Sequence, residues 1–191
     1  MESTPAYEQL RTLASPVCAL TVADAGRVNG MILDSAVRAS ISPKVPRLAV
    51  FVHRWHLSHG MVARSGRFVL HLLHRGQVEL VHRLGFRSGR EGDKVAEVPH
   101  RLTGQGIPLL DDRWCAFECR VANAMDAGAA TCFLADVTAT HDGTGGEVLT
   151  AAWFRANLPA AWREAFLRNY ADAQARIEAL AEIREVRPAR E

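Results

Sequence analysis

Several features that would indicate a membrane or nucleic-acid protein are missing. No apolar run approaches the roughly 20 residues that a membrane-spanning helix needs. The N-terminal stretch lacks the charged segment, followed by an apolar one, that marks a secretory signal peptide. The charges nearly balance, with 23 lysines and arginines against 21 aspartates and glutamates, and a net charge of +2 is too small to indicate nucleic-acid binding. We therefore expect a cytoplasmic protein that binds neither a membrane nor nucleic acid.

Cysteine and lysine are both scarce. Lys44 and Lys94 are the only lysines, so arginine supplies nearly all of the fixed positive charge. The four cysteines lack the paired CxxC spacing of a zinc site, and in a cytoplasmic protein we expect buried thiols. They are Cys18, Cys115, Cys119 and Cys132.

The length and pattern of the chain predict one mainly β domain with a helical tail. A chain of 191 residues, 48% of them hydrophobic, is long enough for one well-packed core. Short alternating or apolar runs between turn signals predict a β-barrel or a sandwich with inserted helices. We expect strands at 17–23, 30–39, 48–52, 67–73, 114–122, 131–140 and 148–154, and helices at 6–14, 56–64 and 76–84.

The tail from 159 to 186 has a different texture. Apolar residues recur there at spacings of three and four, which predicts a long amphipathic helix with one apolar stripe. Such a stripe needs a partner, either the flank of the barrel or a second copy of the chain. We therefore divide the chain into a barrel domain, 1–157, and a C-terminal helix, 158–191.

The stretch 27–59 looks like the rim of a binding site. Asn29 and Gly30 can form a turn, and Asp34 and Ser35 interrupt an apolar run with side-chain oxygens. Polar side chains and bent backbone at the edge of a sheet suit an anionic or heteroaromatic ligand. The structural alternative is that Asp34 and Ser35 are turn residues whose side chains bond to their own backbone.

A cluster of donors follows the apolar strand 48–52. Within seven residues it places hydrogen-bond donors and a fixed positive charge, which favours a phosphate ligand. The alternative is that Ser58 only caps a helix and that Arg54 is only a solvated charge. A metal site is disfavoured because no carboxylate joins the histidines. The cluster consists of His53, Arg54, His56, Ser58 and His59.

Six short motifs in this order resemble a known family. They are NGM, SISP, R-x-x-x-S-H, SGRFVLHLL, G-x-P-L-L and FECRV, spread over about 17–140. Together they resemble the flavin reductase-like family of the FMN-binding split barrel. The resemblance implies a Greek-key antiparallel split barrel, usually a homodimer, that binds FMN or FAD without a covalent bond.

The resemblance also implies an activity. Members reduce flavin with NADH or NADPH and pass it to a partner monooxygenase, so we expect an NAD(P)H-dependent flavin reductase. Two alternatives stay open: a flavin-dependent biosynthetic enzyme with another substrate, and a non-catalytic flavin-binding protein. A heme-binding role has only the number of histidines in its favour.

The resemblance assigns site residues one at a time. The flavin-binding tetrad of the family falls on Ile32, Leu33, Asp34 and Ser35, and only the last keeps its serine. The phosphate-binding positions fall on Arg54 and Ser58 and are intact. The other residues expected at the cofactor are Asn29, Gly30, Val52, His53, His59, Arg87 and Ser88.

Two positions bear on catalysis. His71 stands where the family has an asparagine and is the candidate catalytic residue, with a satisfied core histidine as the alternative. A family G-D-H triplet, whose histidine lies close to the flavin and the nicotinamide, is replaced by Gly128, Ala129 and Ala130. One holder of the nicotinamide is therefore missing, which puts hydride transfer in question more than flavin binding.

Overall fold

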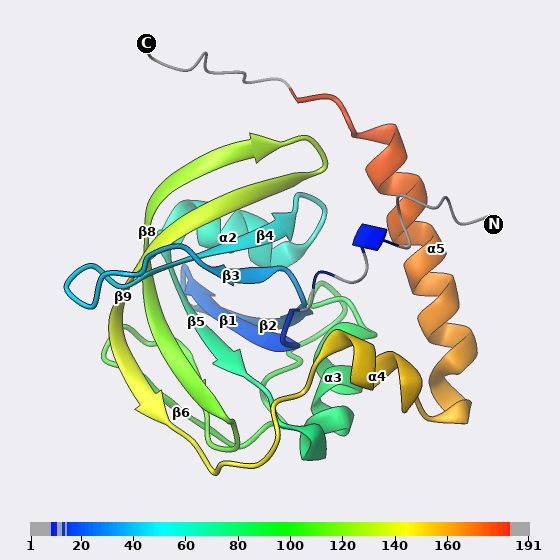
Figure 1. Ribbon diagram of the computed structural model, residues 1–191, viewed down its shortest axis with the longest axis horizontal. Helices are drawn as coiled ribbons and strands as arrows, with labels where there is room; N and C mark the ends of the chain where they lie inside the picture. Colours follow the sequence, from blue (N-terminus) through cyan, green and yellow to red (C-terminus); the bar gives the residue numbers. More distant parts are fainter. Residues whose placement is uncertain (1–8, 11–12, 14, 184–191) are drawn as a thin grey trace.

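The structure is a computed structural model, and it describes residues 9–10, 13 and 15–183. Seven antiparallel strands form one curled sheet in the described chain, in the order β2-β1-β5-β8-β9-β4-β3 (Figure 1). This confirms the expected antiparallel barrel. The strands are β1 (Cys18–Asp24), β2 (Arg27–Leu33), β3 (Ala36–Arg38), β4 (Arg47–His53), β5 (Arg67–Leu72), β8 (Cys115–Ala127) and β9 (Ala130–Asp142).

The barrel is split between two strands that follow each other in sequence. β2 and β3 are the two edges of the sheet, and only Asp34 and Ser35 connect them. The prediction of one strand over 30–39 is therefore wrong, because the chain bends there and crosses from one edge to the other. The Ser35 hydroxyl donates to the Phe51 carbonyl (2.9 Å), and the Phe51 amide donates to the Ser35 carbonyl (3.2 Å). These bonds fix the bend against β4.

Two helices follow the pattern expected from the sequence. α2 (Leu57–Ser65) ends at Gly66, whose φ of 64° lies in the left-handed region that glycine adopts without strain. α3 (Val78–Gly85) begins with a 3₁₀ turn, η1 (Arg75–Gln77). His74 and Gln77 bond reciprocally to each other's backbone as a capping box, which explains where this helix starts.

The segment predicted as a last strand is a helix. Residues 148–154 make only two isolated bridges in the described chain, Val148 with His74 and Thr150 with Pro16, before α4 (Ala151–Ala156) begins. The Thr150 hydroxyl caps α4 by accepting a bond from the Trp153 amide at 3.2 Å. Ala151 and Phe154, three residues apart, are buried on one side of α4. Helical spacing and a cap therefore override the β-branched residues at the start of this segment.

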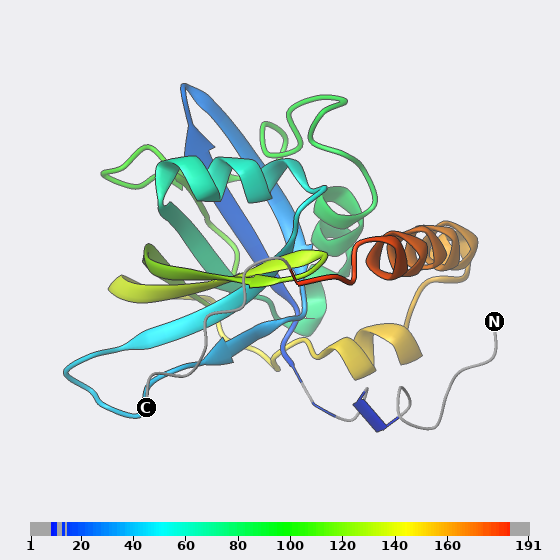
Figure 2. The same cartoon turned by 90° about the horizontal axis from the view of Figure 1, so that it is seen from above.

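The tail forms a shorter helix than predicted. A 3₁₀ turn, η2 (Ala160–Trp162), leads into α5 (Arg163–Ala179), whereas the prediction extended over 159–186, of which 184–186 lie outside the described residues. α5 runs beside the barrel (Figures 1 and 2). The helix predicted over 6–14 falls mostly outside the described residues. In the described chain no helix is long and apolar enough to cross a bilayer.

Apolar side chains form two main cores. One fills the barrel, with Leu20, Val50 and Phe68 fully buried. The other lies between the outer face of the sheet and the helices α3 and α4, where Leu84, Leu149 and Phe154 pack together. A small second sheet of β6 (His100–Leu102) and β7 (Pro108–Leu110) packs beside β1 and β5.

The four cysteines are free thiols in the described chain. Cys18 and Cys119 are buried as expected, whereas Cys115 and Cys132 are only half-buried. Burial raises the thiol pKa of all four, because it disfavours the charged thiolate. All four are therefore held in the thiol form at neutral pH.

His71 has a structural environment rather than a catalytic one. Its ring is fully buried, with Nδ1 at 3.2 Å from the Ala19 carbonyl and Nε2 accepting from the Leu110 amide at 3.1 Å. Both ring nitrogens are thus committed to backbone and tie β5 to β1 and β7. Burial lowers the pKa of His71 to about 3, so the ring stays neutral. This geometry favours the core alternative over the catalytic one.

His71 should make the stability of the protein depend on pH. Between about pH 6.5 and about pH 3 the unfolded chain binds a proton that folded His71 does not, so stability falls as the pH drops through this range. A His71→Gln variant can keep both backbone bonds without this titration. We expect wild type to lose about 2 kcal/mol more than the variant between about pH 7 and about pH 5 in urea unfolding. Equal losses would contradict the assignment.

Candidate functional site

Two adjoining cavities lie where the barrel is split, between the sheet and α5. The first, of about 420 Å³, is called the basic cavity, and the second, of about 520 Å³, the apolar cavity. They share Met31, His56 and Ala173, so they form one continuous space. Their walls come from the end of β2, the end of β4, the start of α2, the loop after α3, and α5.

Positive charge dominates the basic cavity. Four cations face two carboxylates there, which favours an anionic ligand. The cations come from two segments far apart in sequence, the loop after α3 and α5. They are Arg87, Arg90, Lys94 and Arg176, and the carboxylates are Glu91 and Asp172.

Lys94 is the most deeply placed of these cations. It is 6% exposed, and its Nζ donates to the carbonyls of Leu84 (2.5 Å) and Arg87 (3.0 Å). Both acceptors are neutral, so no contacting carboxylate in the described chain balances its charge. Burial, together with the nearby Arg87 guanidinium, lowers the pKa of Lys94 to about 8. Glu91 on the same cavity offsets part of this effect, but a buried ammonium that bonds only to neutral carbonyls would still be stabilised by an anionic ligand.

Asn29 and Ser58 meet at the floor of the basic cavity. The Asn29 Nδ2 donates to Ser58 Oγ at 2.8 Å, and both side chains are buried. Gly89 lies against this pair: a Cβ there would stand 2.1 Å from Asn29 Oδ1, so only glycine allows the approach. The predicted residues Asn29, Ser58, Arg87 and Ser88 therefore line one cavity.

The loop after α3 is held over the cavity by backbone contacts. Arg27 Nη2 donates to the Gly89 carbonyl (2.5 Å), and Arg90 Nη1 donates to the Trp55 carbonyl (2.9 Å). Asp93 Oδ1 accepts from the amides of Val95 and Ala96, which turns the chain toward the second core. The glycine-rich loop is thus positioned by the Arg27 side chain of β2 and by the Trp55 carbonyl in the turn after β4.

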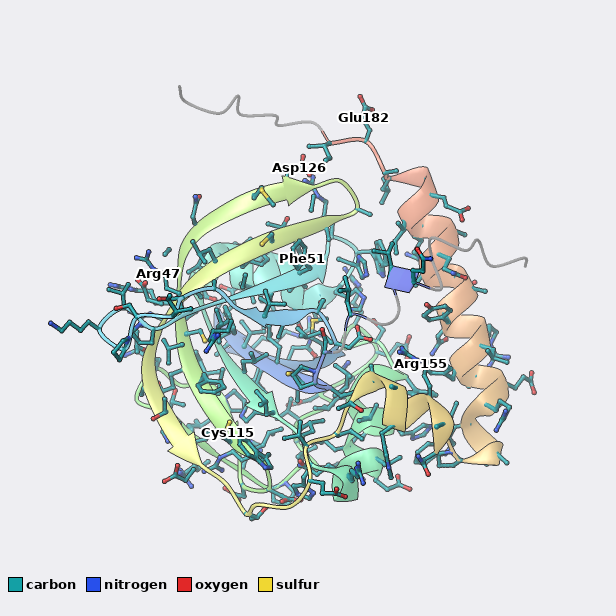
Figure 3. All side chains as sticks on the ribbon, in the orientation of Figure 1. Arg47, Phe51, Cys115, Asp126, Arg155 and Glu182 are labelled. Atoms are coloured by element: carbon teal, nitrogen blue, oxygen red, sulfur yellow. The ribbon has the colours of Figure 1, made fainter. Side chains whose placement is uncertain are left out.

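The apolar cavity holds the other predicted residues of the rim. Ile32, Leu33, Asp34, Ser35 and His53 all contribute to its walls. Phe51 on β4 faces it, and Arg155 of α4 stands across from Asp34, with Nη1 at 3.8 Å from Oδ2 (Figure 3). Met31, Tyr170 and Ile177 add apolar surface. A flat, largely apolar group with polar edges would suit this lining.

His53 has an unused polar atom at this cavity. Its Nδ1 is buried and has no hydrogen-bond partner among the described residues. The ring stacks on Trp55, with centroids 4.4 Å apart and planes 6° from parallel. Its partner in the sheet is Ala130, which offers only a methyl group. A buried nitrogen without a partner is costly, so His53 is suited to bond to a ligand.

The histidines at the rim are neutral near pH 7. Burial lowers the pKa of His53 and of His59, and it lowers the pKa of His56 to about 4 with help from its cationic neighbours. They can therefore hold a ligand by hydrogen bonds rather than by charge. In the described part of the chain no group of three or more His, Cys, Asp or Glu is arranged to hold a metal ion.

Arg54 and Ser58 do not meet at one cavity. Arg54 Nη2 pairs with Asp126 Oδ1 at 2.5 Å and lines a separate cavity beside Gly128, while Ser58 bonds Asn29. Asp126 lies at the end of the β8–β9 hairpin, near Glu182 just past α5 (Figure 3). The joint phosphate site expected from the sequence is therefore divided. Lys94, rather than Arg54, lines the basic cavity together with Ser58.

Three other predicted residues lie away from the two cavities. Val52 is fully buried in the barrel core, and a Cβ on Gly30 would contact Leu84 and Val95 at 3.1–3.3 Å. His59 packs against β9, with Nε2 2.8 Å from Thr131 Oγ1. None of the three is among the lining residues of either cavity. Gly30 and Val52 support the site only by packing.

Sequence reasoning missed several residues of the walls. Trp55 and Arg90 stood in no recognised motif. The amphipathic pattern of the tail predicted a packing surface and not the wall of a binding site. Lys94 left one signal, since it is one of only two lysines. The missed residues of the basic cavity include Trp55, Arg90, Lys94, Asn169, Asp172 and Arg176.

Comparison with known proteins decides what this architecture is. A sequence model described as "Flavin reductase like domain" matches residues 10–161. The chain belongs to the flavin reductase-like family. The solved structures include the FMN-binding protein from Thermus thermophilus with bound p-hydroxybenzaldehyde, at 27% identity and a TM-score of 0.65. The match covers 74% of this chain and 78% of that one, so the split-barrel fold is confirmed.

Two curated relatives add to the family assignment. The high molecular weight rubredoxin of Moorella thermoacetica is 30% identical over 76% of this chain and 63% of its own length. A flavin reductase of Pseudomonas putida is 26% identical over 59% of this chain and 64% of its own length. This chain thus spans just under two thirds of the length of each of these two relatives.

The bond between Asn29 and Ser58 should contribute measurably to stability. A Ser58→Ala variant leaves the Asn29 Nδ2 donor buried without an acceptor, which costs about 1–3 kcal/mol in unfolding free energy. Chemical denaturation measures this, and Ser42→Ala, in the exposed loop before β4, is the control. If both variants have the same free energy of unfolding, the bond between Asn29 and Ser58 does not stabilise the fold.

Proposed function

We propose that the protein binds FMN or FAD across the two cavities and reduces flavin with NADH or NADPH. The observation that carries the proposal is the pairing of a basic cavity with an adjoining apolar one at the split of the barrel. A flavin nucleotide has the same two parts, an anionic phosphate and a flat aromatic ring. Family membership and the named flavin reductase relative support the same conclusion.

The residues present fit the phosphate end of such a ligand. Lys94 would place an unbalanced ammonium at the phosphate, and the Ser58 hydroxyl lies on the same wall. Arg87 and Ser88 would close over it from the glycine-rich loop. The excess of cations over carboxylates would offset the charge of the phosphate.

The residues at the apolar cavity fit the ring end. The orphaned Nδ1 of His53 would find a partner at a polar edge of the ring, and Ser35 and Asp34 lie along the same wall. Met31, Ile32 and Leu33 would exclude water from one side. When bound, the flavin supplies the two-electron chemistry, by taking a hydride from the nicotinamide. The protein contributes position and electrostatics, because its rim histidines stay neutral.

The proposal extends to assembly and location. We expect a cytoplasmic homodimer that passes reduced flavin to a monooxygenase. Exposed apolar side chains on the β3–β4 hairpin, a surface of the kind that proteins usually bury against a partner, support the dimer. These are Val37, Ile41 and Val45.

Turnover with a nicotinamide tests the reaction itself. Purified protein is mixed with FMN or FAD and with NADH or NADPH, and the loss of nicotinamide absorbance is followed. We expect flavin-dependent oxidation of one of the two nicotinamides. No oxidation with either nicotinamide and either flavin would overturn the proposed reaction.

Lys94 tests the phosphate end separately. Lys94→Met should weaken FMN binding by about 10- to 100-fold, the loss of one hydrogen bond to a charged group, and leave riboflavin binding unchanged. In wild type, FMN affinity should also fall as the pH rises above about 8, where Lys94 loses its proton. The variant should lack this fall. The control is Lys44→Met in the exposed loop before β4, and an equal loss in that variant would contradict the assignment.

A further inference from the structure

α5 adds a wall to the site that the family domain does not supply. The matched family domain ends at residue 161, and α5 begins at Arg163. Residues of α5 nevertheless line both cavities. The barrel side of the site therefore lies within the matched domain, while the opposite wall lies beyond its end.

α5 is held at its two ends. At the start, Phe166 contacts Phe86 and Phe154, with ring centroids 6.1 and 5.9 Å apart, and Trp162 stacks on His82 at 4.3 Å. Past its end, the chain crosses the β8–β9 turn so closely that a Cβ on Gly128 would lie 2.6 Å from the Ala181 carbonyl oxygen. Between these anchors no residue of α5 is buried.

The middle of α5 is therefore only partly covered by the rest of the chain, with Tyr170 stacked on Phe166 at 6.0 Å between ring centroids. Tyr170 and Ile177 remain 37% and 38% exposed, although they lie on the side that lines the apolar cavity. An amphipathic helix normally buries such a stripe. α5 lies beside the barrel (Figure 2). The two cavities are lined both by α5 and by the barrel.

Two neighbouring stripes of α5 line the two cavities and differ in chemistry. Asn169, Asp172 and Arg176, at spacings of three and four, line the basic cavity. Tyr170, Gln174 and Ile177 line the apolar cavity, and Ala173 lies between the two sets. One helix thus presents a guanidinium to the basic cavity and an aromatic ring to the apolar one.

We propose that α5 is a lid that selects phosphorylated flavin, with Arg176 binding the phosphate and Tyr170 covering the ring. The inference rests on the proposed function. A guanidinium binds phosphate with two parallel hydrogen bonds, and aromatic rings stack on one another. Arg176 also lies over Trp55, 5.9 Å from the ring centroid, which holds it at the rim of the basic cavity. The bound flavin would supply the packing that the middle of α5 lacks.

Two substitutions separate the roles of the lid. Arg176→Gln should raise the dissociation constant of FMN about tenfold or more and leave that of riboflavin, which has no phosphate, within about twofold. Tyr170→Ala should raise both constants by a similar factor. Arg168→Gln is the matched control, because Arg168 pairs with Glu164 and lines neither cavity. Quenching of flavin fluorescence measures each constant.

Limited trypsin digestion gives a readout that does not depend on affinity. α5 contains the cleavage sites Arg163, Arg168 and Arg176. FMN should slow cleavage at all three sites in wild type, at Arg163 and Arg176 in Arg168→Gln, and much less in Tyr170→Ala. Mass spectrometry of the fragments identifies the sites that are cut.

The outcomes separate the lid from the function of the site. If wild type binds FMN, but Arg176→Gln and Tyr170→Ala bind it equally well and digestion is unchanged, the lid is overturned and the flavin site remains. If Arg176→Gln weakens riboflavin as much as FMN, its role at the phosphate is overturned. If wild type binds no flavin at all, the lid and the proposed function are both overturned.

Discussion

The seam of the barrel is the constraint on which the rest of the structure depends. The two edge strands of the curled sheet, β2 and β3, follow each other directly in sequence. They form no hydrogen-bonded ladder with each other. Asp34 and Ser35 carry the chain across, and Ser35 is tied to Phe51 of β4. Because hydrogen bonding stops at the seam, the sheet opens there. The two cavities lie along this opening, and the loop after α3 and the tail helix border it.

Burial tunes the charge of the basic cavity, where Lys94 contacts no carboxylate among the described residues. Desolvation keeps His53 and His56 neutral, while Lys94 remains a cation whose partners are only carbonyls. Arg54, the more obvious cation in the sequence, is instead paired with Asp126 on the β8–β9 hairpin. The charge of Arg54, which stands in a motif, is thus paired with a carboxylate. Lys94, which stands in no motif, bonds only to carbonyls.

Much of the fold could be predicted from local pattern, because strands and caps leave short-range signals. The strand from Leu48 and the helix that ends at Gly66 follow from alternation and from a left-handed glycine. The α4 segment was misjudged because the Thr150 cap outweighs β propensity. Only part of the site could be predicted. Asn29 and Ser58 stood in motifs. Arg176 is more than 100 residues from both in the chain, and it lines the same cavity only because α5 packs against the barrel.

The state of the cysteines matters for a protein of this kind. Reduced flavin that meets dioxygen produces hydrogen peroxide, which attacks thiolates rather than thiols. Burial raises the pKa of all four cysteines, and Cys18 and Cys119 are also shielded from solvent. Under the proposed function, the chain is therefore built to survive the oxidant that its own product generates.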